Sequence, residues 1–366
     1  MEKSKKKFFY ISETNIPSKS ANSIHVAKMI EAASARGYDT NLIVPYCNSI
    51  LSYKKFYNIK GKINVISILK KKKNINFFYR IIFAVKVFFF LKKKKDCNII
   101  SRSVLSSLIL STNKIVNTVE IHHSLKGMTN FIFKLINKNI SYYLNFVLIH
   151  KNLKKILNLF GKNVLVLDDA VNLKDFSHKK KLKKNDTIVY IGSFFLGKGL
   201  DLIYSIAKLR PNYKFDLYGD TKNIIKSNYK LKNLNFLGHV EYNKIPEILA
   251  KYNYAIMPYG EKVNVQSSNL DVSNTMSPLK MFDYLASSQV IFATDTSVYK
   301  HILKNNYNCV LIKHDKVYKW IKAIDDLKKN LSLKIKLKKN ALKTAKKYTW
   351  DLRFKLIEKK FFTSLL

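Results

Sequence analysis

The chain has 366 residues, of which 47% are hydrophobic, and its formal net charge is +43. The length predicts two domains, because a single core seldom grows this large, and the apolar content excludes a chain that is disordered throughout. Only five of the 67 basic residues are arginines, so 62 are lysines, which lack the bidentate fork that reads bases. The charge therefore argues less for nucleic acid than for an anionic membrane surface or an anionic substrate.

The cysteines and the start of the chain bear on its location. Cys47, Cys97 and Cys309 are few, odd in number and far apart, so they predict neither a disulfide framework nor a metal site. Free cysteines are typical of a reducing cytoplasm. The first residues contain no long apolar core, and we expect no signal peptide.

In the first half, short apolar runs alternate with helix-length segments. The clearest predicted helix covers residues 23–36, with Gly37 as its C-terminal cap. Strands that alternate with helices are typical of βαβ units and a parallel sheet. The predicted strands are 7–12, 40–45, 63–68, 97–101, 114–121, 145–150 and 163–168.

The second half repeats this pattern after a lysine-rich stretch, 177–186, which suits a linker. Helices are expected to begin near Lys198, Ile245 and Ser277. The sequence thus predicts two facing doubly wound, Rossmann-like α/β domains, with ligands bound at the carboxyl ends of the strands. The strands of this half are 187–192, 213–219, 233–238, 254–258, 290–294 and 308–312.

The most apolar stretch, residues 77–91, is too short to span a bilayer and contains Arg80 and Lys86. Lysine runs flank it on both sides. It is either a helix that lies on an anionic membrane surface or a core helix, and the sequence leaves both open.

The segment that begins with Ser277 and Pro278 predicts a helix with serine as N-cap and proline in the first position. The free N–H groups of such a helix start suit a phosphate. Asp283 lies too far along the helix to cap it, and there it can accept hydrogen bonds from ribose hydroxyls. The plain alternative is an ordinary capped helix with an aspartate on its surface.

Three further groups of residues follow predicted strands, where a ligand is expected. The first is a glycine-rich turn from Gly192 to Gly199 around Lys198, which suits a phosphate but equally fits a simple turn. The second is the pair His122 and His123, of which one can move a proton, unless both are surface residues. The third follows the first strand and contains Ser20, Asn22 and His25; a satisfied, half-buried His25 is the alternative to a functional one.

Together these stretches resemble the bacterial glycosyltransferases of family 4, which have the GT-B fold. The segment "SPLKMFDYLASSQVIFATD" resembles the family's Ser-Pro-x-Lys-x-x-Glu-Tyr-Met-Ala segment, and "YIGSFFLGKGLDLI" resembles its phosphate loop. Similar stretches are "NIPSKSANSIHVAKMIEA", "VEIHH", "VLDDAVNLKDF" and "YTWDLRFKLI", in the family's order along nearly the whole chain.

The resemblance implies a role for each candidate. His122 corresponds to the active-site histidine near the transferred sugar, and Asp283 to the acid that binds the nucleotide ribose. Lys198 meets the diphosphate. The remaining donor-binding residues are Gly192, Ser277 and Lys280, and the acceptor-side loop contributes Ser20, Asn22 and His25. No metal and no cofactor are implied.

Three positions depart from the family's pattern. Thr275 replaces the first glutamate of its acidic pair, Ser193 replaces the arginine of the phosphate loop, and Ser288 replaces a glycine. Asp283 is also one methylene shorter than glutamate. These departures affect contacts with the sugar more than nucleotide binding, and a weakened or inactive member remains an alternative.

The resemblance implies a retaining glycosyltransferase that moves a sugar from a nucleoside-diphosphate sugar to a glycan or lipid-linked acceptor in the synthesis of surface polysaccharide. Its expected parts are an acceptor-side domain, 1–170, a nucleotide-sugar domain, 171–345, and a segment, 346–366, that crosses back. We expect it in the cytoplasm, at the inner face of the membrane. The alternative is a basic protein that binds nucleic acid or membrane on an inactive scaffold of this kind.

Overall fold

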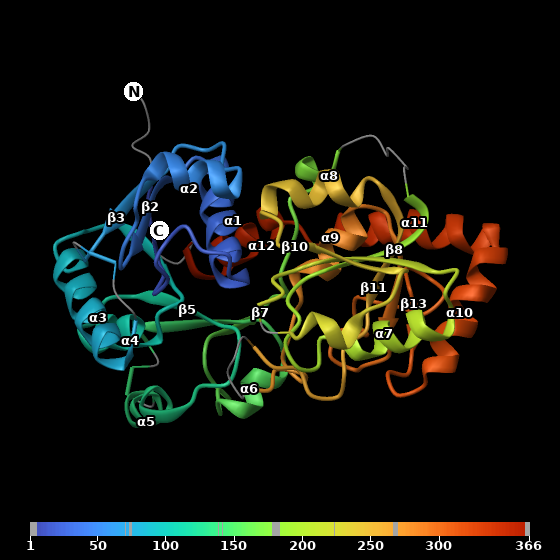
Figure 1. The fold of residues 1–366 in the computed structure, drawn as a ribbon. Coiled ribbons are helices and arrows are strands. Elements are labelled where there is room, and N and C mark those ends of the chain that lie inside the picture. The colour runs from blue at the N-terminus through green and yellow to red at the C-terminus, as the bar shows by residue number, and fades with distance from the viewer. Residues whose placement is uncertain are drawn as a thin grey trace. The chain divides into compact units, whose positions relative to one another are not determined.

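The computed structural model describes residues 6–69, 71–72, 75–137, 139–140, 142–177, 184–222, 224–265 and 270–362. The chain divides into two compact units, each with its own sheet (Figure 1). Unit 1 comprises Met1–Asp168 and Trp350–Leu366, so it is built from both ends of the chain. Unit 2 comprises Asp169–Thr349.

The sheet of unit 1 has seven parallel strands in the order β3-β2-β1-β4-β5-β6-β7. Its central strands are almost continuously buried, because helices cover both faces of a parallel sheet, and they therefore read as unbroken apolar runs. The strands are β1 (Lys7–Ile11), β2 (Asp39–Val44), β3 (Asn64–Ser67), β4 (Cys97–Ser101), β5 (Asn117–Ile121), β6 (Leu144–Leu148) and β7 (Val164–Val166).

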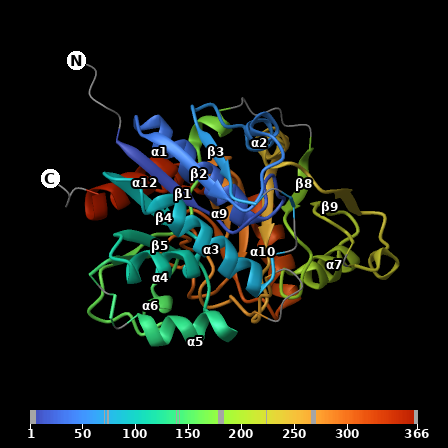
Figure 2. The same ribbon diagram turned by 90° about the vertical axis from the view of Figure 1, so that its left-hand side faces the viewer.

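Helices pack on both faces of this sheet. Phe9 of β1 belongs to a core cluster with Phe83 and Val87 of α3 (Phe77–Leu91), whereas the adjacent Phe8 packs edge-on against Phe354 of α12 (Trp350–Ile357). Helix α12 also lies against α1 (Ala21–Ala35), as Figure 2 shows. The other helices are α2 (Ile50–Tyr57), α4 (Val104–Thr112), α5 (Gly127–Ile136), α6 (Asn152–Ile156) and the π-helix η4 (Glu358–Phe362).

The sheet of unit 2 has six parallel strands in the order β10-β9-β8-β11-β12-β13, and residues of its strands belong to a core cluster that includes Trp320. Its strands are β8 (Lys184–Ile191), β9 (Lys214–Tyr218), β10 (Leu234–Gly238), β11 (Tyr252–Met257), β12 (Val290–Thr294) and β13 (Val310–Ile312). Its helices are η1 (Leu173–Phe176), α7 (Leu200–Leu209), η2 (Lys226–Tyr229), η3 (Tyr242–Lys244), α8 (Ile245–Leu249), α9 (Leu279–Ala286), α10 (Val317–Lys329) and α11 (Leu331–Ala345).

The predicted fold class is confirmed: both sheets are parallel, with the crossover order of doubly wound domains. Each predicted apolar run contains a strand, although β5 begins three residues later than expected. Of the lysine-rich stretch 177–186, residues 178–183 lie outside the described residues, and the last three residues already belong to β8.

The predicted start of the Ser277 helix is wrong by one residue. Helix α9 begins at Leu279 with Pro278 as its N-cap residue, and no side chain caps it. The Ser277 hydroxyl instead accepts a hydrogen bond from the backbone N–H of Asp169, at 3.0 Å. The hydroxyl of Ser277 therefore holds the first residue of unit 2 in place. No side-chain cap in the described chain accepts a hydrogen bond from the N–H groups in the first turn of α9.

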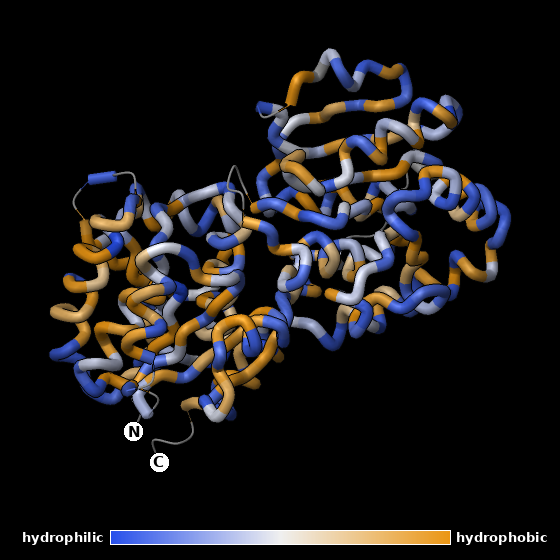
Figure 3. Tube along the Cα trace, turned by 90° about the horizontal axis from the view of Figure 1, so that it is seen from below, coloured by the Kyte–Doolittle hydropathy of each residue, from blue (hydrophilic) through white to orange (hydrophobic). Residues whose placement is uncertain are grey.

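The core-helix alternative for residues 77–91 holds in part, and contact with a membrane stays a prediction. Helix α3 buries Phe83, Val87 and Leu91 in the core of unit 1, but Phe78 and Phe89 are 65% and 54% exposed. Hydrophilic and hydrophobic residues are interspersed along both units (Figure 3). Among the described residues, none of the helices has the length and apolar character that crossing a bilayer requires.

Candidate functional site

The glycine turn that follows β8 lets a lysine side chain pass close to the backbone. Gly192 has φ +152°, and a Cβ placed there would lie 2.4 Å from Nζ of Lys280. The position therefore tolerates only glycine while Lys280 keeps its place. Gly199, with φ +88°, is the N-cap residue of α7, as a tight entry into a helix requires.

Lys280 stands in the first turn of α9 with its ammonium group buried against aromatic rings. Its Nζ lies 3.8 Å from the ring centroid of Tyr190 and 5.4 Å from that of Tyr259. Within the described part of the chain, Nζ has no hydrogen-bond partner. Burial, and then the charge of Lys198, hold the pKa of Lys280 well below its ordinary value. A buried cation without an acid is a site that an anion would complete.

Lys198 is the second cation at this place. Its Nζ lies 5.2 Å from the ring centroid of Tyr259, the same ring that Lys280 approaches. Burial lowers the pKa of Lys198 to about 8. When both lysines are protonated they repel each other, and a diphosphate between them would relieve both the repulsion and the lost hydration.

Asp283 is buried in the middle of α9, at 3% exposure, so the alternative of a surface aspartate is wrong. Its Oδ1 accepts a hydrogen bond from the hydroxyl of Tyr242, at 3.2 Å. Burial raises the pKa of Tyr242 well above its ordinary value, and the charge of Asp283 raises it further. A carboxylate held in this way is oriented to accept further hydrogen bonds.

The three positions that depart from the family's pattern have local roles. Thr275 is buried, and the carbonyl of Ser193 accepts a hydrogen bond from the hydroxyl of Tyr190, at 2.7 Å. Ser288 follows α9 with φ +52°, the left-handed conformation that explains why glycine suits this position. Its hydroxyl donates to the carbonyl of Lys338 at 2.8 Å, which offsets part of that strain.

In unit 1, the buried carboxylate of Glu120 on β5 joins three elements. It accepts hydrogen bonds from Tyr10 on β1, from Nε2 of His25 on α1 at 3.1 Å and from Arg353 on α12 at 2.6 Å. Burial alone would raise the pKa of Glu120, but His25 and Arg353 hold it well below its usual range. His25 is therefore fully buried, and Nε2 of its imidazole contacts the carboxylate of Glu120.

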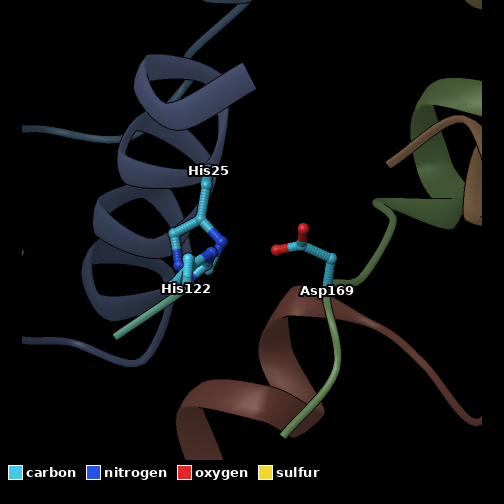
Figure 4. A group of neighbouring side chains, drawn as sticks. All are labelled: His25, His122 and Asp169. Carbon is cyan, nitrogen blue, oxygen red and sulfur yellow. The ribbon is translucent and has the colours of Figure 1, made fainter. Parts of the chain in front are cut away.

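His122 follows β5 by one residue, and its ring lies edge-on to that of His25, with the centroids 4.6 Å apart (Figure 4). Burial, and then the charges of Arg102, His25 and Arg353, lower its pKa well below the ordinary value, so the imidazole is neutral. Its Nε2 is buried and has no hydrogen-bond partner in the described ranges. His122 can therefore accept or donate a proton toward a bound group.

The two small polar candidates of unit 1 have different positions. Ser20 is the N-cap of α1 and accepts a hydrogen bond from the N–H of Ser23, which is a structural role. Asn22 lies within α1 and donates to the hydroxyl of Thr14 at 2.8 Å, while its Oδ1 is buried without a partner among described residues. Of the two, only Asn22 presents a polar atom that a ligand could satisfy.

Unit 2 thus brings Gly192, Lys198 and Lys280 together, and Asp283 follows Lys280 on the same helix. Unit 1 brings His25 and His122 together around Glu120. The sequence analysis did not assign the rings of Tyr190 and Tyr259, nor Glu120 and its partner Arg353. Three of them carried a signal, because Tyr190, Glu120 and Arg353 each lie in a stretch that carries the resemblance.

The sequence profile of the family described as "Glycosyl transferases group 1" matches residues 172–344, which is nearly all of unit 2. The search of curated proteins gave no match. Among solved structures, a glycosyltransferase from Rickettsia africae is 13% identical, with 99% of each chain covered and a TM-score of 0.76. Anabaena Alr3699/HepE in complex with UDP and glucose is 9% identical, with 98% of this chain and 99% of that chain covered and a TM-score of 0.72.

WaaG, a glycosyltransferase involved in lipopolysaccharide biosynthesis, is 11% identical, with 96% of this chain and 99% of that chain covered and a TM-score of 0.65. At these identities the structural matches establish the fold over the whole chain, and the family profile establishes the type of the second unit. Residues 172–344 are thus a group 1 glycosyltransferase domain, in a chain that has the GT-B fold over its whole length.

Proposed function

We propose that this glycosyltransferase uses a nucleoside-diphosphate sugar as donor and transfers its sugar, with retention of the anomeric configuration, to a glycan or lipid-linked acceptor in cell-surface polysaccharide or lipopolysaccharide synthesis. The observation that carries the proposal is the pair Lys198 and Lys280, two cations around one tyrosine ring with no acid beside them in the described chain. A diphosphate would supply the negative charge that this site lacks.

In this proposal the donor lies along unit 2. The two lysines hold the diphosphate, and the free N–H groups that begin α9 add the positive end of a helix dipole. Asp283 accepts hydrogen bonds from the ribose hydroxyls. When the sugar leaves, negative charge grows on the diphosphate, and cations already fixed in place stabilise that charge without reorganising.

Unit 1 supplies the acceptor side. His122 is the proposed catalytic residue, since its neutral imidazole has a free Nε2 to place against the reacting sugar or the acceptor hydroxyl. Glu120 fixes His25, and His25 fixes the face of His122, so the ring is held in position before substrate binds. The charge stabilisation proposed above comes from protein groups alone, and no metal or cofactor is part of the proposal.

The finer points draw on relatives that share the fold. HepE holds UDP and glucose, which supports a UDP-sugar as the first donor to test, and WaaG acts in lipopolysaccharide biosynthesis. The retaining mode and the lipid-linked acceptor follow the family resemblance of the sequence. The division into a nucleotide-sugar domain and an acceptor-side domain belongs to the same proposal.

We also propose that unit 1 binds an anionic membrane surface, which would place the enzyme at the inner face of the cell membrane. Phe78 and Phe89 of α3 are exposed, and α5 exposes Met128, Phe131 and Leu135 at helical spacing. Helix α4 packs against both α3 and α5. Apolar side chains beside many lysines suit an interface of lipid tails and anionic headgroups.

Calorimetry with UDP, GDP and ADP tests the donor site. We expect at least one of them to bind, and Lys280→Met to raise the Kd about 10–150-fold, the equivalent of losing about 1.5–3 kcal/mol for a charge-assisted hydrogen bond. Lys319→Met removes an exposed lysine of unit 2 and should leave the Kd unchanged. The proposal fails if none of the three nucleotides binds, or if Lys280→Met binds them as tightly as the unaltered protein.

A further inference from the structure

Arg102 differs from the other arginines of this chain. Each of the other four lies beside a carboxylate: Arg36 beside Glu358, Arg80 beside Glu13, Arg210 beside Asp325 and Arg353 beside Glu120. Arg102 has no acidic partner within the described residues, and its Nη1 is buried without any hydrogen bond there. A chain that uses arginine almost only in ion pairs therefore leaves one guanidinium unpaired.

The backbone holds Arg102 firmly at the carboxyl edge of the sheet. It follows Ser101, the last residue of β4, which pairs with Ile11 of β1 and Val119 of β5. Its N–H donates to the carbonyl of Ile11 at 2.8 Å, and the next residue, Ser103, is the N-cap of α4. Arg102 thus stands where doubly wound sheets bind ligands.

The acid on the neighbouring strand already accepts hydrogen bonds on both of its oxygens. Glu120, across the sheet from Arg102 on β5, accepts hydrogen bonds on Oε1 from Arg353 and on Oε2 from Tyr10 and His25. The charge of Arg102 contributes to lowering the pKa of both Glu120 and His122, after the larger effects of burial and, for Glu120, of His25 and Arg353. Arg102 and His122 directly follow the paired strands β4 and β5 at the same edge of the sheet, and Nη1 of Arg102 has no hydrogen bond among the described residues.

We propose that Arg102 binds an anionic oxygen group of the acceptor, a phosphate ester or a carboxylate, beside His122. The planar guanidinium offers parallel N–H donors that match such a group bidentately, and His122 offers Nε2 as a further polar contact. The inference rests on the proposed function, which makes unit 1 the acceptor side. It specifies that the acceptor is charged and that Arg102 sets its position next to the proposed catalytic histidine.

The test measures binding at unit 1 without donor or transfer. The imidazole signals of the eight histidines are recorded by NMR on the full chain labelled with ¹³C-histidine, and the His122 signal is assigned by its loss in His122→Gln. Phenyl phosphate and benzoate are then titrated separately. We expect one of them to shift the His122 signal saturably and to raise the His122 pKa, because an anion beside the ring favours the imidazolium.

Arg102→Gln should abolish this shift, and Arg102→Lys, which keeps the charge but loses the fork, should weaken binding at least about tenfold. Arg210→Gln removes a paired, 42% exposed arginine of unit 2 and should change nothing. If Arg102→Gln does not fold, the role of Arg102 is judged by comparing probe binding to Arg102→Lys with probe binding to the unaltered protein. Benzoate binding alone assigns a carboxylate, and phenyl phosphate binding alone assigns a phosphate.

The inference is overturned if neither probe shifts the His122 signal, or if both arginine variants respond as the unaltered protein does. Failure here is distinct from failure of the proposed function, because nucleoside diphosphate binding is measured separately through Lys280. A chain that binds UDP but neither probe refutes only the charged acceptor. A chain that binds a probe at Arg102 but no nucleotide refutes only the donor.

Discussion

At the scale of single residues, the proposed donor site is defined by lysines that the protein does not pair with an acid in its described part. Lys280 is buried among aromatic rings and Lys198 stands beside the same tyrosine, although each would be better hydrated on the surface. Such an arrangement costs stability in the empty protein. A bound anion would recover this lost stability as binding free energy, since the anion replaces the lost water and screens one lysine from the other.

The lowered pKa of Lys198 predicts how donor binding depends on pH. Because burial brings this pKa from 10.5 down to about 8, the ammonium is charged below that pH and neutral above it. Nucleoside diphosphate affinity should therefore fall as the pH rises through about 8, by up to about tenfold per pH unit. Calorimetry between about pH 7 and 9.5 measures it, and Lys198→Arg, which stays charged, should flatten the curve. A flat curve in the unaltered protein would place Lys198 outside the site.

Substitutions can separate the proposed ribose-binding role of Asp283 from its hydrogen bond with Tyr242. Asp283→Asn keeps one acceptor oxygen but loses the charge, so the donor KM should rise by the equivalent of about 1.5–3 kcal/mol. Tyr242→Phe removes only the hydrogen bond from the tyrosine, and it should change KM much less. A 2′,3′-dideoxy donor should bind Asp283→Asn and the unaltered protein about equally. Equal KM values for the complete donor would leave Asp283 with a structural role alone.

Asp283→Glu tests the departure from the family's pattern. If the shorter acid fits a pocket of the same design, glutamate should retain or improve activity in steady-state assays. Because Asp283 is 3% exposed, the longer side chain must displace neighbours where the pocket is closed, at a cost of about 1–3 kcal/mol. A lowered melting temperature together with lost activity would show that the pocket has been rebuilt around aspartate.

At the scale of secondary structure, the helices of unit 1 combine core packing with exposed apolar surface. Helix α3 contributes Phe83 and Val87 to the core and leaves Phe78 to solvent. Helix α5 is shorter, buries Thr129 and Phe133, and exposes a stripe on the opposite side. The sequence analysis singled out α3 alone, because α5 has an ordinary apolar content. The exposed apolar residues of α5 can be recognised as a stripe only when the buried face of the helix is known.

This stripe predicts which substitutions release the protein from membranes. Phe131→Ser combined with Leu135→Ser should lower partitioning onto anionic vesicles at least about tenfold, since burying each side chain is worth about 1.5–3 kcal/mol. Co-sedimentation with vesicles of anionic and of neutral lipid measures the effect. Leu331→Ser, at a 64% exposed leucine of α11 in unit 2, is the matched control. Unchanged binding after the double substitution would exclude α5 from the membrane surface.

At the scale of the molecule, α12 closes unit 1 through the buried pair of Arg353 and Glu120. Removing one member leaves a buried charge, so Arg353→Met should destabilise the protein by about 3–5 kcal/mol, against about 0–1 for Arg210→Met at an exposed pair. Thermal unfolding measures the difference. Since the pKa of Glu120 is lowered by folding, its stabilising contribution is complete above the ordinary glutamate range and is lost as the pH falls below it. Equal melting temperatures for both variants would contradict this role.

The strands and the fold class could be predicted because strands buried on both faces leave long apolar runs in the sequence. The start of α9 at Leu279 could not be predicted, since the hydroxyl of Ser277, the predicted cap, is engaged by Asp169, which lies 108 residues earlier in the chain. For the same reason nothing local indicates that Arg353 meets Glu120, 233 residues away, or that Tyr190 shelters Lys280. Local pattern thus predicts which residue types gather at strand ends, and tertiary contacts decide which atoms remain free.

The division of unit 1 between the two ends of the chain sets an order of events during synthesis. When Asp168 has been made, β5 already carries Glu120, but its partner Arg353 does not yet exist. At about 5–20 residues per second, a ribosome needs roughly 9–37 s to produce the intervening residues. During that time Phe8 of β1 lacks the ring of Phe354 that packs against it in the complete protein. The part of the enzyme that is synthesised first is therefore the last to be completed, and a nascent chain has the most need of a chaperone while its second half is being made.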